Sequence, residues 1–310
     1  MKNEPIRHHY IPQFILKNFC TSNTDILWYF DKQSNQLSKK KTRDVFMVKN
    51  LYRDEINIPD NPTEIEQDLA VYENEISRII KEKFLYDKDI VLNFEDYEKV
   101  KLFFAIMGFR AKSTSQKFGE NITQKSRKFY RQYQKNRDFQ DLWKRNLGYI
   151  VKCRSILEII ENPNIDDPFK SFFIRDTIGF SGLNIAVLEA INGASLLIGD
   201  TYPVAVRGMV DSGLQLPLYE MFPISHNRVI LIFETGAKKA PRYVTHFRES
   251  IFNPQIFQNE TNTVKIRTKK LYPEEVDYIN GEILKNSVDG VAASNKEIIN
   301  FMIKDQHFEN

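Results

Sequence analysis

The sequence lacks the features that mark a disulfide-rich protein, a zinc-finger protein or a membrane protein. Only two cysteines are present, Cys20 and Cys153, and neither has a CxxC partner or a histidine at a metal-binding spacing. The most apolar long window, residues 173–199, carries the charged side chains of Arg175 and Glu189, which argue against a span through a lipid bilayer. We therefore expect two ordinary thiols in a reducing, cytoplasmic protein that does not enter a membrane.

Signatures of nucleotide-binding and exported proteins are missing as well. The chain has no glycine-rich loop that could cradle phosphates and no dinucleotide-binding fingerprint. No apolar run precedes the first histidines, so we expect neither a secretory signal nor a transit peptide. With 310 residues, of which 42% are hydrophobic and 13% aromatic, the chain can bury a large core. It is expected to be globular.

Positive and negative charges nearly balance overall, but they are unevenly distributed. The chain has 44 Lys and Arg against 41 Asp and Glu, whereas residues 112–154 carry mostly cations with aromatic side chains between them. This segment can be a surface that tracks the phosphates and stacks the bases of RNA or DNA. It can also be an amphipathic helix that buries Phe129 and Tyr133 and leaves its cations in solvent, and this second interpretation is the favoured one. The residues that we single out for contact with nucleic acid are Lys125, Lys128, Arg131, Tyr133 and Lys135.

The pattern of strands and helices along the chain predicts an α+β fold. β-forming residues flank a polar turn within residues 26–41, which predicts an N-terminal β-hairpin. Apolar residues recur at three-to-four spacing from about residue 62, so the region of about 62–192 is expected to be helical. Short apolar runs broken by Gly, Pro and Asn predict short strands, together with two helices, over about 194–310. Because no linker separates these parts, we expect a single composite domain over residues 1–310.

The opening stretch RHHYIPQFILKNF places two of the five histidines side by side before an apolar ladder. Pro12 restricts the residue before it to an extended conformation, and side chains alternate along an extended chain. We therefore expect His9 to face a functional site, while His8 and Tyr10 point to the other side and His8 faces solvent. The apolar residues that follow, including Phe14, are expected to be buried and to anchor the stretch in the core.

Several motifs occur in an order that suggests a relationship. They are HHYIPQFILKNF, IEQDLAVYENEISRIIKEK, FFAIMGFRAKS, LLIGDTYPVAV and VDYINGEILKNSVDGVAAS. Their order and spacing, over nearly the whole chain, resemble the bacterial family called domain of unknown function 4238. Matched one by one, the resemblance singles out His9, Glu66, Glu73, Arg110 and Asp200. Here GDTYP stands where the family usually has SDNP, and the family implies no settled activity.

The matched residues suggest a chemistry. Glu66 and Glu73 are two helical turns apart, so both project from one helix face and a cation can lie between them. With His9 and Asp200 they would form a nitrogen and oxygen ligand set suited to Mg²⁺, Mn²⁺ or Zn²⁺, and we expect Mg²⁺ or Mn²⁺. Arg110 would hold a phosphate by two parallel hydrogen bonds. Such a set predicts phosphoester hydrolysis, with His9, Asp200 and Arg110 as catalytic residues.

The same residues also have ordinary structural interpretations. His9 can donate to a backbone carbonyl, and Asp200 can cap the turn before Pro203. The two glutamates can pair with surface cations such as Arg78 or Lys81.

Three hypotheses about function therefore stay open. The first is a metal-dependent nuclease or phosphodiesterase, acting on nucleic acid or another phosphate ester in bacterial defence. The second is a non-enzymatic sensor or binding module for an anionic ligand or a partner protein in a defence or toxin system. The third is a structural subunit of a complex. The sequence does not specify the oligomeric state.

Overall fold

A computed structural model describes residues 6–20, 24–117, 139–167, 169–170, 173, 183–209, 215–234 and 255–306. Within these residues the chain is an α+β protein, as predicted, and it divides into two compact units that interleave along the sequence. Unit 1 comprises Met1–Tyr10, Met47–Arg78 and Glu98–Ser181. Unit 2 comprises Ile11–Phe46, Ile79–Tyr97 and Gly182–Asn310. Each unit is described by itself, so the single composite domain stays a prediction.

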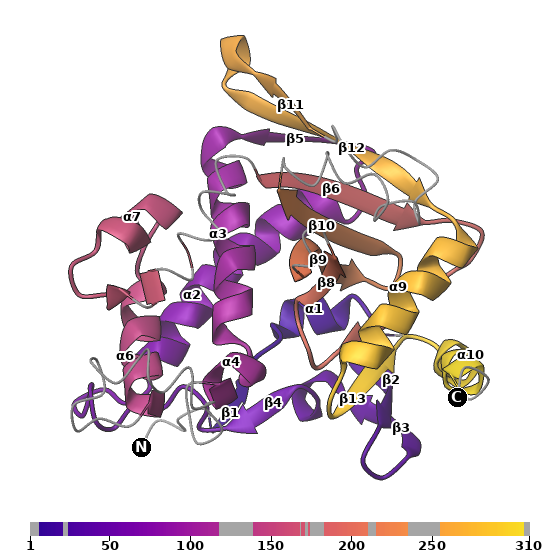
Figure 1. Ribbon diagram of the computed structural model, residues 1–310, viewed down its shortest axis with the longest axis horizontal. Helices are drawn as coiled ribbons and strands as arrows, with labels where there is room; N and C mark the ends of the chain where they lie inside the picture. The colour runs from indigo at the N-terminus through magenta and orange to yellow at the C-terminus, as the bar shows by residue number, and fades with distance from the viewer. Residues whose placement is uncertain are drawn as a thin grey trace. The chain divides into compact units, whose positions relative to one another are not determined.

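Unit 1 is mainly helical in its described residues (Figure 1). Its small sheet consists of β1 (Arg7–His9), which pairs antiparallel with β4 (Met47–Lys49). The helices that lie wholly or largely in this unit are α2 (Glu64–Ile79), α3 (Phe94–Arg110), α4 (Lys112–Lys117), α6 (Phe139–Ile150) and α7 (Ile156–Glu161).

Helix α2 is the long amphipathic helix predicted from the sequence. Ile65, Leu69, Tyr72 and Ile76 recur every three or four residues, and each is at most 3% exposed. A helix with 3.6 residues per turn places such residues on one face, which is the face that packs inward. The ring centroid of Tyr72 lies 6.3 Å from that of Phe103 on α3. This contact joins α2 to α3 within unit 1.

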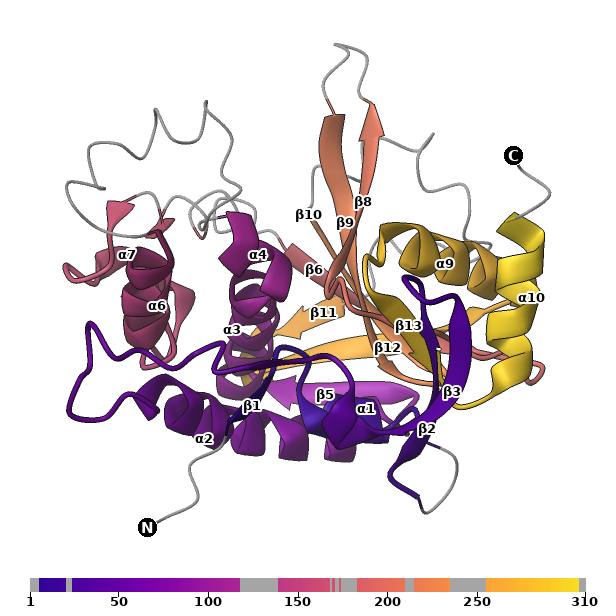
Figure 2. The ribbon, with the colours of Figure 1, turned by 90° about the horizontal axis from the view of Figure 1, so that it is seen from below.

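Unit 2 contains a sheet of seven strands (Figures 1 and 2). The strand order is β11-β12-β6-β10-β9-β8, and β5 also pairs with β12. All pairs are antiparallel except β12 with β6. Figure 2 shows β8 and β9 as a long twisted ribbon. The strands are β5 (Asp89–Asn93), β6 (Leu183–Ala190), β8 (Val204–Met209), β9 (Gln215–Ser225), β10 (Arg228–Glu234), β11 (Gln255–Gln258) and β12 (Thr263–Leu271).

A second sheet of unit 2 has the order β3-β2-β13-β7. The predicted N-terminal hairpin is confirmed, because β2 (Ile26–Asp31) pairs antiparallel with β3 (Gln36–Lys41). On its other side β2 pairs with β13 (Gly290–Ala293), which in turn pairs with β7 (Ile198–Gly199). A Cβ atom at Gly290 would lie 2.3 Å from the carbonyl oxygen of Phe30, so this close approach of β13 to β2 requires glycine.

Helices complete unit 2. Figure 1 shows α9 and α10 beside β13. The helices are α1 (Gln13–Lys17), α9 (Pro273–Asn286) and α10 (Lys296–Gln306), with the short helices η1 (Thr42–Asp44), η2 (Ile80–Phe84) and η5 (Asn259–Thr261).

The prediction of a helical region over about 62–192 is wrong at β5 and β6. The stretch LNIAVLEA of β6 is a nearly continuous apolar run, and such a run does not distinguish a buried strand from a buried helix. Its neighbours decide the outcome, because β6 lies between β12 and β10 and is bonded to both. A nearly continuous apolar run is typical of a strand whose two faces are both buried.

The expectation that Phe14 is buried is also wrong. Its side chain is half-buried, whereas Ile15, Leu16 and Phe19 are fully buried. The anchoring face of α1 therefore begins one residue later than predicted. A helix of five residues presents only one narrow buried face, so a neighbouring position can be left at its edge.

None of the helices in the described part of the chain is long and apolar enough to cross a membrane.

Candidate functional site

Both histidines of the opening stretch are buried in unit 1. His8 is 0% exposed and His9 is 8% exposed. The backbone N–H of Tyr52 donates to Nδ1 of His8 at 2.9 Å, and the two rings stack with their centroids 5.5 Å apart. The prediction that His8 faces solvent is therefore wrong. Alternation along β1 does send the two side chains to opposite faces, but Tyr52, which follows the partner strand β4, covers the His8 ring.

Arg110, at the C-terminal end of α3, is the centre of a polar cluster in unit 1. Its side chain is only 2% exposed. Nε donates to the hydroxyl of Tyr52 at 3.1 Å, Nη1 donates to Glu73, and Nη2 donates to the backbone carbonyl of His9. The Tyr52 hydroxyl donates back to the carbonyl oxygen of Arg110 at 3.2 Å. All three guanidinium nitrogens thus bind protein atoms. Arg110 ties together β1, α2 and the Tyr52 segment, and its role as a phosphate clamp stays a prediction.

Burial governs the protonation of this cluster. Burial raises the pKa of Tyr52 to about 12, against the influence of Arg110, so the hydroxyl keeps its proton and can donate. Burial alone would lower the pKa of Arg110, but Tyr52 and Glu73 outweigh it and raise the pKa. Arg110 therefore stays charged, with Glu73 as its counter-ion. The ion pair links the end of α3 to α2 within unit 1.

Glu66 lies two turns before Glu73 on the same face of α2. Its Oε2 atom is buried and has no hydrogen-bond partner among the described residues. Burial raises the pKa of Glu66 to about 7, while Arg110 lowers it and Glu73 raises it further. Near neutral pH the carboxyl group is therefore protonated roughly half of the time. A carboxyl in this condition can both accept and donate a proton.

We expect the variant Glu66→Gln to change the pH dependence of stability. The folded protein holds the Glu66 proton with a pKa of about 7, against an ordinary value of 4.5, so folding favours the protonated form. Wild-type stability, relative to the variant, should thus be highest below pH 4.5 and fall as the pH rises to about 7. Between pH 4.5 and pH 8 the free energy of unfolding of wild type, measured relative to that of the variant, should fall by about 2–3 kcal/mol. Urea unfolding across this range measures the difference.

The matched control for this experiment is Glu75→Gln on the same helix, because the side chain of Glu75 is 40% exposed. It should show no comparable trend with pH. A difference between Glu66→Gln and wild type that stays constant from pH 4.5 to 8 would contradict the prediction.

The predicted metal ligands are divided between the two units. His9, Glu66 and Glu73 belong to unit 1. Asp200 belongs to unit 2. In the part of the chain that the structure describes, no group of three or more His, Cys, Asp or Glu side chains could hold a metal ion. The predicted metal site of His9, Glu66, Glu73 and Asp200 stays a prediction. Two of its carboxylates, those of Glu66 and Glu73, lie on one face of α2.

Asp200 anchors a turn within unit 2. Its Oδ1 accepts the backbone N–H of Val288 at 2.9 Å and that of Gly290 at 3.5 Å, while Oδ2 accepts the N–H of Asp289 at 2.9 Å. Burial raises the pKa of Asp200, and these backbone donors lower it in part. The carboxylate therefore fixes the turn before β13 to the end of β7. Both oxygens bind backbone, so the catalytic role of Asp200 stays a prediction without support from its surroundings.

The basic segment divides into described and undescribed parts. The residues that we singled out for nucleic-acid contact, namely Lys125, Lys128, Arg131, Tyr133 and Lys135, lie outside the described residues. The described cations that follow them bind groups of unit 1. These contacts are Lys144 with the carbonyl of Arg53, Arg145 with Asp166, Lys152 with Glu64, and Arg154 with Glu75. Phe129 also lies outside the described residues, so both interpretations of the segment stay predictions.

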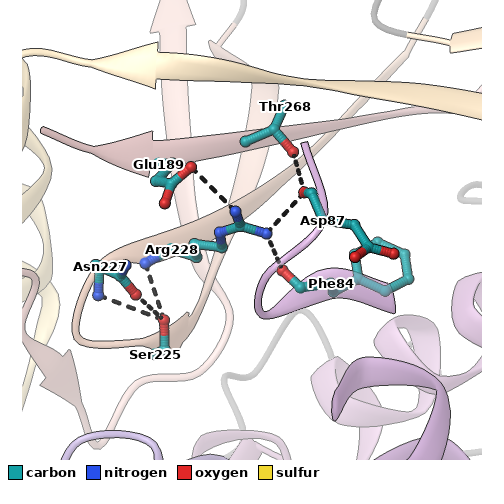
Figure 3. A network of polar contacts seen from close by, with 7 residues as sticks. All are labelled: Phe84, Asp87, Glu189, Ser225, Asn227, Arg228 and Thr268. Carbon is teal, nitrogen blue, oxygen red and sulfur yellow. Dashed lines mark hydrogen bonds and ion pairs between the residues drawn. The ribbon is translucent and has the colours of Figure 1, made fainter. Parts of the chain in front are cut away.

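A second buried arginine, Arg228 of unit 2, was not among the predicted site residues. Figure 3 shows its guanidinium between the end of η2 and strand β6. Nη1 donates to the carbonyls of Phe84 at 2.8 Å and Asp87 at 3.0 Å, and Nη2 donates to Glu189 at 3.0 Å. The hydroxyl of Thr268 donates to the same Asp87 carbonyl at 3.0 Å. The sequence offered one signal, an arginine at the head of the apolar strand RVILIFE.

A family model described as "Protein of unknown function (DUF4238)" matches residues 7–297 of the 310 in the chain. The chain belongs to this family. The match includes every residue that the sequence resemblance singled out. No match was found among curated proteins or among solved structures. Membership in the DUF4238 family therefore assigns no activity, and any function has to be argued from the chain itself.

Within this DUF4238 chain, the residues matched to the family belong to both units. Arg110 and Glu73 form an ion pair in unit 1, and Glu66 lies within electrostatic reach of both. Asp200, in the stretch GDTYP that departs from the family pattern, holds backbone in unit 2. Of these residues, Glu66 is the one with an unsatisfied buried oxygen. It is the best candidate for a reactive group.

Proposed function

We propose that the chain is a metal-dependent nuclease or phosphodiesterase whose reaction takes place at Glu66 in unit 1. The observation that carries this proposal is the buried Oε2 of Glu66, which has no hydrogen-bond partner among the described residues and lies in the field of a second carboxylate, Glu73. A buried carboxyl with a strongly shifted pKa is a common property of catalytic sites. Nucleic acid or another phosphate ester is the proposed substrate.

The donor set fits a hard divalent cation in one respect. Mg²⁺ is usually held by one or two carboxylates, with water and substrate phosphate as its other ligands. Glu73 would supply such a carboxylate, while Arg110 keeps Glu73 in position through their ion pair. When bound, Mg²⁺ or Mn²⁺ would lower the pKa of a water molecule and neutralise charge on the phosphate.

Proton transfer is the step assigned to Glu66. In its deprotonated form the carboxylate accepts a proton from the attacking water, whose oxygen bonds to phosphorus as the ester P–O bond breaks. The proton then passes to the leaving oxygen. Without a cation the pKa of Glu66 is about 7, so both protonation states occur at neutral pH. A cation that Glu66 ligated would keep it ionised, so Glu66 is assigned the proton transfer with Glu73 as the carboxylate that holds the cation.

The test is cleavage of labelled RNA, single-stranded DNA, duplex DNA and a simple phosphodiester by the purified full chain, with Mg²⁺, Mn²⁺ or EDTA. We expect metal-dependent cleavage of at least one substrate. Glu66→Gln should lower its rate by about 10²- to 10⁴-fold, the usual contribution of a general acid or base. Glu75→Gln should cleave at the wild-type rate. Equal rates for wild type and Glu66→Gln, or no cleavage under any condition, would refute the proposal.

One observation favours the second hypothesis, a non-enzymatic module that binds an anionic ligand or a partner protein. The described residues contain no group of three metal-ligating side chains, whereas most protein metal sites with high affinity use three or more. Retained binding of a substrate with no turnover in the same assay would support this second function.

A further inference from the structure

An aromatic and basic surface lies on the smaller sheet of unit 2. Its central residue is Trp28 of β2, whose ring is partly exposed. The Nζ atom of Lys39 lies 5.2 Å from the centroid of this ring, and that of Lys296, the first residue of α10, lies 5.7 Å from it. We call Trp28, Lys39, Lys41 and Lys296 the Trp28 surface.

The register of the hairpin places two of these lysines on the face of Trp28. Lys39 is directly opposite Trp28, and Lys41 is opposite Ile26. Because side chains alternate along a strand, Lys39 and Lys41 project from the same face as Trp28. Lys39, Lys40 and Lys41 are all exposed, and β3 forms an edge of the sheet in the described residues.

The charge of this surface is mainly positive. Lys296 is 49% exposed and has one acidic neighbour, Glu297, at 3.9 Å. Among the described residues, Lys39 and Lys41 form no ion pair with an acidic side chain, although each has a long and exposed side chain. A row of lysines on an edge strand also discourages pairing with other sheets. That role does not require a partly exposed tryptophan on the neighbouring strand.

We propose that the Trp28 surface binds single-stranded nucleic acid. An unpaired base would stack on the Trp28 ring, and the adjacent phosphates would contact Lys39, Lys41 and Lys296. The ammonium group of Lys39 or Lys296, which contacts the ring in the free protein, would move from the ring to a phosphate next to the stacked base. Bases in a duplex already stack on one another, so the surface selects single strands. The proposal does not depend on the proposed hydrolysis at Glu66, which belongs to the other unit.

The test uses the emission of tryptophan. The chain has two tryptophans, Trp28 and Trp143, and Trp143 is only 1% exposed. Quenching by an added ligand therefore reports contact with Trp28. A short oligonucleotide of mixed sequence is titrated into the full-length chain in EDTA, which prevents metal-dependent cleavage. We expect quenching of Trp28 emission together with a rise in the anisotropy of a label on the oligonucleotide.

Variants separate stacking from charge. Trp28→Leu should remove the quenching and weaken binding by roughly 5- to 100-fold, the usual effect of losing one base stack. Lys39→Gln and Lys296→Gln should each weaken binding and reduce the salt dependence by about 0.7 in log–log slope per lost phosphate contact. The matched control is Lys285→Gln on α9, because Lys285 is 73% exposed and lies outside the surface. It should bind like wild type.

Several results would overturn the proposal. They are the absence of binding at low salt, the same loss of affinity in Lys285→Gln as in Lys39→Gln, and equal affinity for duplex and single-stranded oligonucleotides. Equal affinity for poly-glutamate would also overturn it, in favour of an acidic protein partner. Binding without cleavage leaves this proposal intact and counts against the hydrolase. Cleavage without quenching of Trp28 emission would support the hydrolase and would overturn binding at the Trp28 surface.

Discussion

Replacing Arg110 by methionine should destabilise unit 1 by about 3–5 kcal/mol, the usual cost of removing one partner from a buried ion pair. The side chain donates to the carboxylate of Glu73, to the carbonyl of His9 and to the hydroxyl of Tyr52. Methionine fills a similar volume but donates nothing, so three acceptors would stay partly buried without their donor. The free energy of urea unfolding at pH 7 measures the effect.

Two further variants make this expectation specific. Arg78→Met is the matched control, because Arg78 is an exposed arginine of α2, and it should change stability by less than about 0.5 kcal/mol. The double variant Arg110→Met/Glu73→Leu should recover part of the loss, since it no longer leaves a carboxylate without its counter-ion. If Arg110→Met unfolds at the same urea concentration as Arg78→Met, Arg110 does not hold the unit together.

Replacing Arg228 by methionine should destabilise unit 2 by about 3 kcal/mol or more, because the side chain is 1% exposed and binds three acceptors. Figure 3 shows that two of these acceptors, the carbonyls of Phe84 and Asp87, belong to the chain that leaves η2. Loss of the guanidinium should therefore free this chain segment from the sheet. Lysine cannot span the same acceptors, so Arg228→Lys should recover only part of the stability.

Hydrogen exchange tests where the loss occurs. In Arg228→Met the backbone amides of about residues 84–88 should exchange faster than in wild type, since the segment loses two of its bonds to the arginine. The matched control is Arg267→Met, because Arg267 is an exposed arginine of β12, and it should exchange like wild type. Unchanged exchange in this segment of Arg228→Met would contradict the assigned role.

Burial of both large polar clusters has a consequence for function. Arg110 and Arg228 have chemistry suited to anions. Arg110 donates from all three of its side-chain nitrogens to protein acceptors, and Arg228 donates from both Nη atoms, while its buried Nε has no hydrogen-bond partner among the described residues. Each arginine fixes chain segments that are distant in sequence. The two proposals therefore rest on other groups, namely the buried carboxyl of Glu66 in unit 1 and the exposed lysines beside Trp28 in unit 2.

The sequence by itself determined the features that depend on neighbours along the chain. The hairpin of residues 26–41 follows from β-forming residues about a polar turn, and the buried face of α2 follows from its apolar period. The family resemblance is of the same kind, because ordered motifs can be read without coordinates, and the match to residues 7–297 confirms it. Glu66 and Glu73 also share a helix face as their spacing predicts.

Only the tertiary structure decided which partners these residues meet. Arg110 binds the carbonyl of His9, 101 positions earlier in the chain, and no local pattern announces such a contact. Burial of His8 depends on Tyr52, and the strand state of β6 depends on β10 and β12. In each case burial and hydrogen bonding are set by segments far apart in sequence. Periodicity reports the geometry of one segment, whereas these partners depend on how several segments pack.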